Sequence, residues 1–319
     1  MGEKGDDMIT LSKDTFYGIV IVVLAGLLLL SIFTSGFGLV KANTVDQVQN
    51  GATNNSPTNN PSGNVQGGNT NPPANPNAVL TLEVPSLTSS APTMGSATSG
   101  ITVLEFSDYQ CPFCGLAYGS PWASGYAAQY GPIIGTVKKL ETDYVGTGKV
   151  NFKHFPVAFL GQESVDSSNA ALCAGTQNLY FKMHDAIFEH QTNEENNGKY
   201  SKANLKAMAQ NISGLDTTAF DSCLDADTYV QQISAMTADC SQVSKANQIA
   251  SGVPAAQAGL GTPTFYVAID SSKFSEAKVK AAAESIGYEW GKSADGKTYV
   301  ILGNPEYTKL KSVIDALLN

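Results

Sequence analysis

Two cysteines separated by two residues are the part of the sequence best suited to carry out chemistry. They lie in Val103–Cys114, where a mostly apolar run leads into Cys111-Pro112-Phe113-Cys114. If a helix begins just after Cys111, the unpaired N–H groups and positive dipole of its first turn favour a thiolate there, and proline fits the first helical position. Cys114 can then reach the same sulfur. The pattern predicts dithiol–disulfide exchange, with Cys111 as the nucleophile and Cys114 as the resolving thiol.

Two other uses of a Cys-x-x-Cys pair fit this sequence less well. Zinc needs four ligands, typically in two closely spaced pairs, and the remaining cysteines and histidines do not supply a second pair. They are Cys173, Cys223, Cys240, His154, His184 and His190. A purely structural disulfide would close too short a loop to restrict the unfolded chain. We therefore expect no metal and no cofactor, and we expect His154 and His184 to be structural.

The composition bears on partners and on compartment. The chain has 319 residues, enough for one or two domains, and a net charge of −9. All of its cationic residues are lysines, which argues against a nucleic-acid-binding surface. Five cysteines are too few for a disulfide scaffold but unusual for an inert cytosolic chain.

An uncharged apolar segment near the N-terminus predicts a membrane anchor at residues 15–40. Its core, Phe16–Phe33, has about the length that a spanning helix needs. A cleaved signal peptide would have a shorter apolar region and end in a small-residue cleavage site, and Val40-Lys41-Ala42 is a poor one. The lysines before and after the segment favour a cytoplasmic location for residues 1–14. The body of the chain would then lie outside the cell membrane.

Residues 41–78 are rich in Asn, Pro, Thr, Gly and Ser and predict a disordered linker. Such a tether has a root-mean-square reach of about 30–35 Å. A globular domain at 79–319 would be able to sample the membrane surface.

The rest of the chain predicts strands, then a helical region, then strands again. We expect strands at 78–84, 101–107, 149–155, 261–269 and 297–303. We expect helices at 167–176, 179–191, 201–211, 217–224, 228–251, 275–285 and 307–318. The polar segment 287–296 predicts an exposed connection.

Four aromatic residues follow Cys111 at intervals of four: Tyr118, Trp122, Tyr126 and Tyr130. This spacing predicts one helix that packs an aromatic stripe against the sheet. Asp108 and Tyr109, just before the cysteines, are expected to be turn and surface residues.

Three segments together resemble the DsbA-like branch of the thioredoxin superfamily, in particular its membrane-anchored bacterial and archaeal forms. They are Val103–Cys114, the helical region and Gly261–Phe265. The resemblance covers about three quarters of the chain. It implies an α/β thioredoxin-like fold with a helical subdomain inserted at about 163–251.

The resemblance also implies roles for residues outside the cysteine pair. Pro263 would be the family's cis-proline facing the cysteines, whereas without the resemblance a trans proline opening an edge strand is the better interpretation. The Thr262 backbone would pair with an extended substrate, and Pro112 and Phe113 would tune the thiolate and contact the substrate. Glu105 would be a buried acid that moves the proton of Cys114, unless it is a partly exposed charge at a strand end.

Cys173 and Cys223 fall in the predicted helical insertion. In an oxidising compartment two buried helix cysteines can be bridged, and we expect a structural disulfide Cys173–Cys223. Cys223–Cys240 is the competing pair, since sequence does not fix connectivity.

The resemblance implies an extracytoplasmic thiol–disulfide oxidoreductase. We expect it to act as a dithiol oxidase that introduces disulfides into exported proteins with thiols. The family suggests re-oxidation by a quinone-linked membrane partner of the DsbB or VKOR kind. A disulfide reductase or isomerase, a non-catalytic anchored peptide-binding module and a metal chaperone are the alternatives.

Overall fold

The computed structural model describes residues 79–96 and 98–319. The predicted cytoplasmic terminus 1–14, anchor 15–40 and linker 41–78 lie outside these residues. Within the described part of the chain, no helix combines the length and the apolar character that crossing a membrane requires.

The described residues form a seven-stranded mixed sheet in the order β1-β6-β7-β5-β3-β4-β2. The strands are β1 (Leu80–Thr81), β2 (Thr93–Met94), β3 (Ile101–Ser107), β4 (Asn151–Pro156), β5 (Thr264–Asp270), β6 (Trp290–Lys292) and β7 (Thr298–Leu302). β3 pairs with β4 in parallel and with β5 antiparallel, and β5 pairs with β7 antiparallel. β3 is therefore a central strand, as its apolar sequence predicts.

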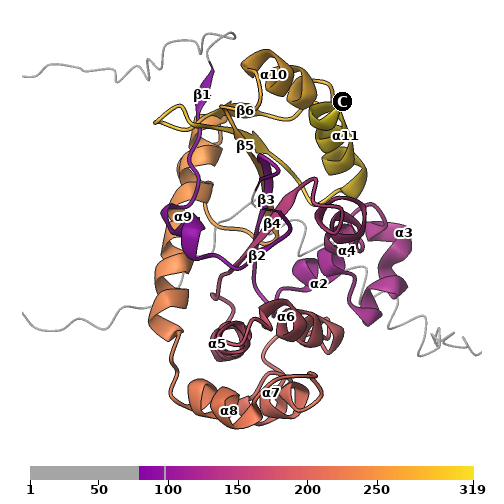
Figure 1. Ribbon diagram of the computed structural model, residues 1–319, viewed down its shortest axis with the longest axis vertical. Helices are drawn as coiled ribbons and strands as arrows, with labels where there is room; N and C mark the ends of the chain where they lie inside the picture. Colours follow the sequence, from indigo (N-terminus) through magenta and orange to yellow (C-terminus); the bar gives the residue numbers. More distant parts are fainter. Residues whose placement is uncertain (1–78, 97) are drawn as a thin grey trace, which may run out of the picture. The chain divides into compact units, whose positions relative to one another are not determined.

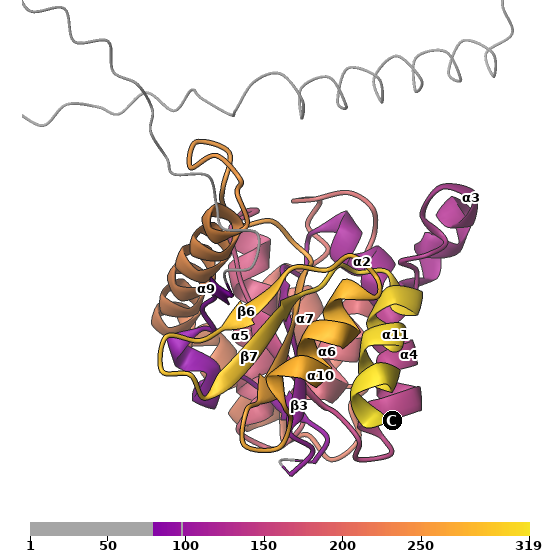
Figure 2. The same ribbon diagram turned by 90° about the horizontal axis from the view of Figure 1, so that it is seen from above.

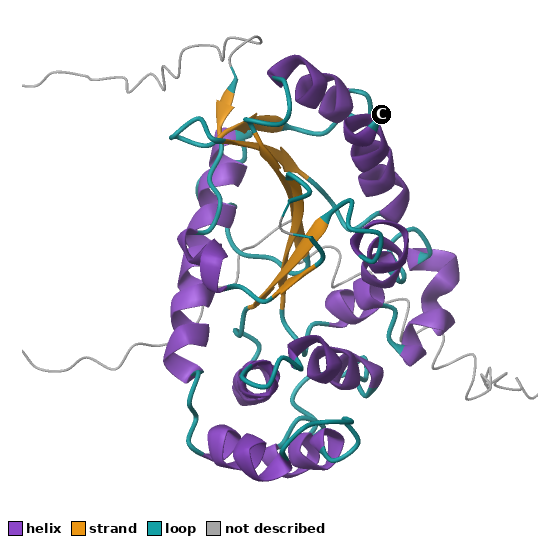
Figure 3. Ribbon diagram, viewed as in Figure 1, coloured by secondary structure: helices purple, strands orange, loops and turns teal. Residues whose placement is uncertain are grey.

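Helices cover both faces of this sheet (Figures 1 and 3). They are α2 (Pro112–Tyr118), α3 (Ala127–Tyr130), α4 (Thr136–Leu140), α5 (Gln162–Gly175), α6 (Tyr180–Glu189), α7 (Lys202–Ala209), α8 (Thr217–Asp225), α9 (Val230–Ala250), α10 (Glu276–Glu284) and α11 (Tyr307–Leu318). α9 lies alone against one face, and α4, α10 and α11 lie against the other (Figures 1 and 2).

Alternation along β3 decides which side chain meets which layer. Leu104 and Phe106 belong to the apolar cluster that includes Met236 of α9. Ile101 and Val103 belong to the larger cluster on the opposite face, with residues of α4, α10 and α11. Because successive side chains of a strand point to opposite faces, Glu105 is directed into the second layer, away from α9.

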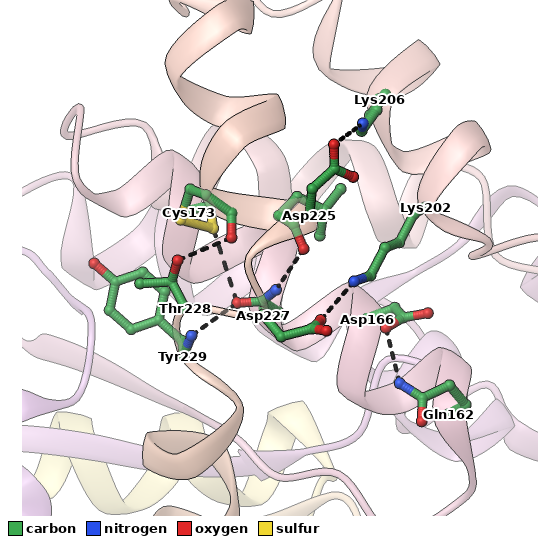
Figure 4. A network of polar contacts seen from close by, with 12 residues as sticks. Gln162, Asp166, Cys173, Lys202, Lys206, Asp225, Asp227, Thr228 and Tyr229 are labelled. Carbon is green, nitrogen blue, oxygen red and sulfur yellow. Dashed lines mark hydrogen bonds and ion pairs between the residues drawn. A yellow bond between two sulfur atoms is a disulfide. The ribbon is translucent and has the colours of Figure 1, made fainter.

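The helical region between β4 and β5 comprises α5 to α9, and its bounds agree with the predicted insertion. α5 to α8 lie together beyond one end of the sheet in Figure 1. A disulfide joins Cys173 of α5 to Cys223 of α8, with 5.8 Å between their Cα atoms. Around it, Lys202 pairs with Asp227 and Lys206 pairs with Asp225 across α7 and the end of α8 (Figure 4).

Three details of the predicted elements are wrong. The aromatic stripe does not form, because the helix after Cys111 ends at Gly119, which adopts a left-handed φ of 91°. A 3₁₀ helix at Pro121–Tyr126 and α3 follow, the Tyr126 side chain is exposed, and α3 stands away from the sheet in Figure 2. Segment 287–296 contains strand β6, and α4 occupies a segment for which no helix was expected.

The order β3-α2-β4, helical insertion, β5-β7-α11 is a thioredoxin-like α/β fold with an inserted helical subdomain. This agrees with the expectation from the resemblance. The fold brings the end of β3, the start of α2 and the start of β5 to the same edge of the sheet, since β5 runs antiparallel to β3.

Candidate active site

Cys111 lies at the N-terminal cap of α2, where a helix stabilises negative charge. Pro112 takes the first helical position, and the Gly115 N–H donates to the Cys111 carbonyl over 3.1 Å. Cys111 and Cys114 are both free thiols in this structure, and both are buried. The local conformation is therefore the one that a nucleophilic thiolate requires.

The segment before β5 completes the surroundings of Cys111. The Thr262–Pro263 peptide bond is cis, and the Cys111 Sγ donates to the Thr262 carbonyl over 3.3 Å. This contact joins residues that are 151 positions apart. The structure thus brings together Cys111, Cys114, Thr262 and Pro263, four of the residues predicted for the site.

The two thiols have opposite tendencies to ionise. The pKa of Cys111 is lowered chiefly by a hydrogen bond from the Cys114 thiol, with further help from Thr262 and from the N–H groups of Cys114 and Phe113, while burial opposes the shift. Burial raises the pKa of Cys114 well above its ordinary value, and the hydrogen bond to Cys111 adds to this. Ionisation is therefore favoured at Cys111 over Cys114.

Glu105 lies close to this pair and is 1% exposed. Its pKa is raised to about 8, chiefly by burial and to a smaller extent by the charge of Cys111, while a hydrogen bond from the Ser107 hydroxyl opposes the shift. Ser107 also lowers the pKa of Cys114, and the charge of Glu105 raises it. The acid and the resolving thiol thus interact electrostatically and share a polar neighbour.

Two histidines lie close to Glu105 in the side-chain layer on the face of the sheet opposite α9. Glu105 and His154 are register partners on the parallel strands β3 and β4, and the ring of His184 from α6 lies 4.7 Å from that of His154, centroid to centroid. All three side chains are buried. One ligand atom from each, three in all, lie within 4.8 Å of one another. Among the described residues this grouping has the residue types and spacing that could accommodate a metal ion, although we expected no metal here.

Gln191, just after α6, holds the cysteine turn in place. Its Nε2 donates to the carbonyls of Tyr109 and Cys111 over 2.8 and 3.0 Å, and its Oε1 accepts from Ser120 Oγ and Trp122 Nε1, both over 3.3 Å. The Gln191 side chain fills the space beside the helix where a Cβ on Gly115 would lie. Gln191 was not among the predicted site residues, because nothing in its local sequence indicates contact with residues 80 positions away.

Asp108 and Tyr109 are not surface residues, and that expectation is wrong. Both are fully buried. The Asp108 carboxylate accepts hydrogen bonds from Gln110 N, Phe159 N, Leu160 N and Ser164 Oγ, so it organises two loops around the site. The position of Asp108 and Tyr109 in a turn suggested that both are exposed. A polar group can nevertheless be buried when its hydrogen bonds are satisfied.

The outer side of the cysteine pair is apolar and accessible. Phe113, between the two cysteines, is 46% exposed, and its ring makes an edge contact with that of Tyr130, with centroids 5.6 Å apart. Pro112, Thr262 and Pro263 are each partly exposed. These residues form a surface that a polypeptide segment can reach.

The other cysteines lie away from this surface. Cys173 and Cys223 form the disulfide within the helical insertion, which is the pairing that the sequence analysis preferred. Cys240 is a free, buried cysteine on α9, in the apolar cluster of the opposite face of the sheet. Burial raises its pKa above the ordinary value, which argues against a reactive role.

Comparison with protein families gives one match. A family model described as thioredoxin matches residues 134–282. The matched part begins after the two cysteines and includes Pro263 and the whole helical insertion.

Curated relatives match over a similar length. A Na⁺/H⁺ antiporter NhaA 1 of Salinispora arenicola is 25% identical over 173 residues, which are 54% of this chain and 21% of that protein. An antiporter of the same description from Mycobacterium sp. strain KMS is 27% identical over 127 residues, which are 40% of this chain and 17% of that protein. The chain thus spans about a fifth of the length of the curated relatives it matches.

Solved structures of low sequence identity resemble the described fold. BdbD of Bacillus subtilis is 20% identical, covers 76% of this chain and 100% of its own, and gives a TM-score of 0.48. The α-DsbA1 protein of Wolbachia pipientis is 18% identical, covers 74% of this chain and 92% of its own, and gives a TM-score of 0.45.

Proposed function

We propose that this chain is a DsbA-like thiol–disulfide oxidoreductase of the thioredoxin superfamily and that it acts as a dithiol oxidase. It would introduce disulfides into exported proteins through Cys111 and Cys114. The observation that supports this most directly is the placement of Cys111 Sγ, which lies at a helix N-terminus and 3.3 Å from the Thr262 carbonyl beside a cis-proline.

The lowered pKa of Cys111 supports the oxidase direction. A disulfide is a stronger oxidant when its reduced form is more stable, and the environment of Cys111 lowers its pKa and so favours the reduced pair. Phe113 offers no side-chain donor to the thiolate, whereas a histidine in its place would. We therefore expect a reduction potential above that of thioredoxin, which is about −270 mV.

The exchange begins when a substrate thiolate attacks Cys111 Sγ and the bond to Cys114 breaks. The mixed disulfide then holds the substrate at the surface formed by Phe113, Thr262 and Pro263. An extended substrate segment would pair with the Thr262 backbone as an added strand. A second substrate thiolate attacks the substrate sulfur, the product disulfide leaves, and Cys111 departs as a stable thiolate.

The location and partners are part of the same proposal. Residues 15–40 would anchor the chain by a single span, and residues 41–78 would tether a catalytic domain outside the cell membrane. A quinone-linked membrane protein of the DsbB or VKOR kind would take up the two electrons that Cys111 and Cys114 collect. The apolar sequence of the anchor and its flanking lysines are what support this topology.

The equilibrium of Cys111/Cys114 with glutathione tests the proposal. We expect the full chain to oxidise a reduced substrate protein, Cys111→Ser to abolish this activity, and Cys240→Ala, which changes a cysteine on the other face of the sheet, to retain it. A potential near or below that of thioredoxin would instead assign the protein to the reductases or isomerases.

A different outcome would favour an anchored peptide-binding module. In that case the Cys111→Ser variant and the wild type would bind unfolded substrates equally well. Neither of them would oxidise these substrates.

A further inference from the structure

We propose that His184 conducts protons between the buried Glu105–Cys114 pair and solvent, and that the carboxylate of Asp185 is the outer end of this route. The proposal rests on the proposed function and assigns the path by which its proton reaches the surface. The path is needed because the resolving thiol, Cys114, is completely buried.

The inner end of the route is a group of polar atoms that have no partner. Glu105 Oε2, His154 Nε2 and His184 Nε2 are buried, and none of them makes a hydrogen bond within the described part of the chain. A buried polar atom without a partner destabilises the folded state. Three such atoms on three converging groups are explained if they exchange a proton with one another through one shared water or a small rotation of the carboxyl.

The outer end is the second nitrogen of His184. Its Nδ1 lies 3.1 Å from Asp185 Oδ1. The His184 side chain is 2% exposed and that of Asp185 is 42% exposed. The buried imidazole ring is therefore in contact, through Nδ1, with a carboxylate that is exposed to solvent. An imidazole can accept a proton on one nitrogen while it releases another proton from the other nitrogen.

His154 does not offer a comparable outlet. Its Nδ1 lies 2.6 Å from the Tyr180 hydroxyl, and Tyr109 donates to that hydroxyl over 3.3 Å. Burial raises the pKa of both tyrosines, so neither gives up its proton readily. This branch ends in the core. His154 is therefore better placed to orient Glu105 and His184 than to pass their proton to solvent.

The groups that face His184 come from every element packed around it. β3 contributes Glu105, the turn before α2 contributes Tyr109, α2 contributes Tyr118, and β4 contributes His154. α6 itself contributes Tyr180 and Asp185. None of these groups is a lysine, so the route lies among acids, phenols and imidazoles.

The proton steps balance in both half-reactions. When a substrate thiolate displaces Cys114 from the disulfide, the Cys114 thiolate takes the proton of the Glu105 carboxyl, and the Glu105 carboxylate then takes a proton from His184 Nε2. His184 Nδ1 is reprotonated from solvent by way of Asp185. On re-oxidation Cys114 returns its proton to Glu105 and the same groups pass it outward. Because burial raises the pKa of Glu105 to about 8, its carboxyl group is protonated near neutral pH. It can therefore donate this proton to the Cys114 thiolate.

Rapid mixing of the oxidised full chain with a dithiol tests the route. We expect His184→Gln to slow reduction of the Cys111–Cys114 disulfide about tenfold, with a larger solvent deuterium effect than in the wild type and an altered pH profile. Asp185→Asn changes an exposed side chain without risk to the core, and we expect a smaller slowing in the same sense. His190→Gln, an exposed histidine at the end of the same helix, is the matched control and should match the wild type.

The outcomes separate this proposal from the proposed function. If the wild type oxidises the dithiol but His184→Gln and Asp185→Asn keep its rate, pH profile and isotope effect, the route is wrong and the function stands. If the wild type oxidises no dithiol, the proposed oxidase function is wrong, and the proton route that rests on it is wrong as well. A stoichiometric metal in the purified wild type that is lost in His184→Gln would also overturn the route.

Discussion

Three buried groups at the candidate site ionise in different ways, and each difference has a local cause. Cys111 receives hydrogen bonds that favour its thiolate, burial and the hydrogen bond to Cys111 favour the neutral form of Cys114, and burial favours the neutral form of Glu105. At this scale the sequence predicted well, because the Cys-Pro-x-Cys spacing and the alternation around Glu105 are local signals.

Glu105→Gln should make the stability of the protein less dependent on pH. The pKa of Glu105 rises from its ordinary value of 4.5 to about 8 on folding. Between these two pH values the folded protein keeps a proton that the unfolded chain has released, so the free energy of unfolding of the wild type falls as the pH rises. The variant lacks this contribution and should lose less stability from pH 5 to pH 8.

Denaturation of the oxidised proteins with urea at several pH values would measure this effect, since the disulfide removes the two cysteines as titrating groups. Glu284→Gln, on an exposed side chain of α10, is the control and should follow the wild type. Parallel curves for the wild type and Glu105→Gln would show that Glu105 is not desolvated as the structure indicates.

At the scale of elements, contacts between distant segments place the cysteine turn. Gln191 follows α6 and Thr262 precedes β5, yet both touch Cys111. No periodicity or motif in the sequence indicates the Gln191 contact, and the burial of Asp108 depends on partners in the loop near Phe159. These features could not be predicted from the sequence, whereas β3, the helical insertion and α11 could, because each has a strong pattern of its own.

Gly115→Ala should destabilise the protein through Gln191. An added Cβ would collide with Gln191 Oε1 and displace that side chain, leaving the Tyr109 carbonyl without this donor and the Cys111 carbonyl with the Gly115 N–H alone. We expect a loss of about 1–3 kcal/mol in the free energy of unfolding, since a buried group without a partner costs this much.

Gly125→Ala provides a matched control, because nothing lies within 4 Å of the position of its Cβ. In a Gln191→Ala background, Gly115→Ala should cost less than in the wild type, and a double-mutant cycle would report this coupling. Equal costs in the two backgrounds would mean that Gln191 is not what excludes a side chain at residue 115.

At the scale of the whole domain, a disulfide and two apolar layers hold the inserted helices and the sheet together. Cys173 and Cys223 are 50 residues apart in the sequence, so their bond restricts the unfolded chain considerably. The surface ion pairs nearby, such as Lys202–Asp227, contribute little in comparison. No sequence rule fixed this connectivity, since Cys223–Cys240 was a competing pair beside the expected Cys173–Cys223.

Replacing both Cys173 and Cys223 by alanine should lower the free energy of unfolding by about 4 kcal/mol, from the entropy of closing a loop of this length. Because the bond lies within the insertion and not at the thiol pair, the folded variant should keep the reduction potential of Cys111/Cys114. Calorimetry and glutathione equilibration would measure the two quantities. A changed potential would show that the insertion influences the thiols directly.

The contact between Cys111 and the Thr262 carbonyl has a consequence for the newly made chain. The carbonyl belongs to a segment 151 residues further along, so a partly synthesised polypeptide carries the cysteine pair without the contact to Thr262. Full reactivity then arrives only with the last strands, and an unfinished molecule is protected from cross-linking itself to its neighbours.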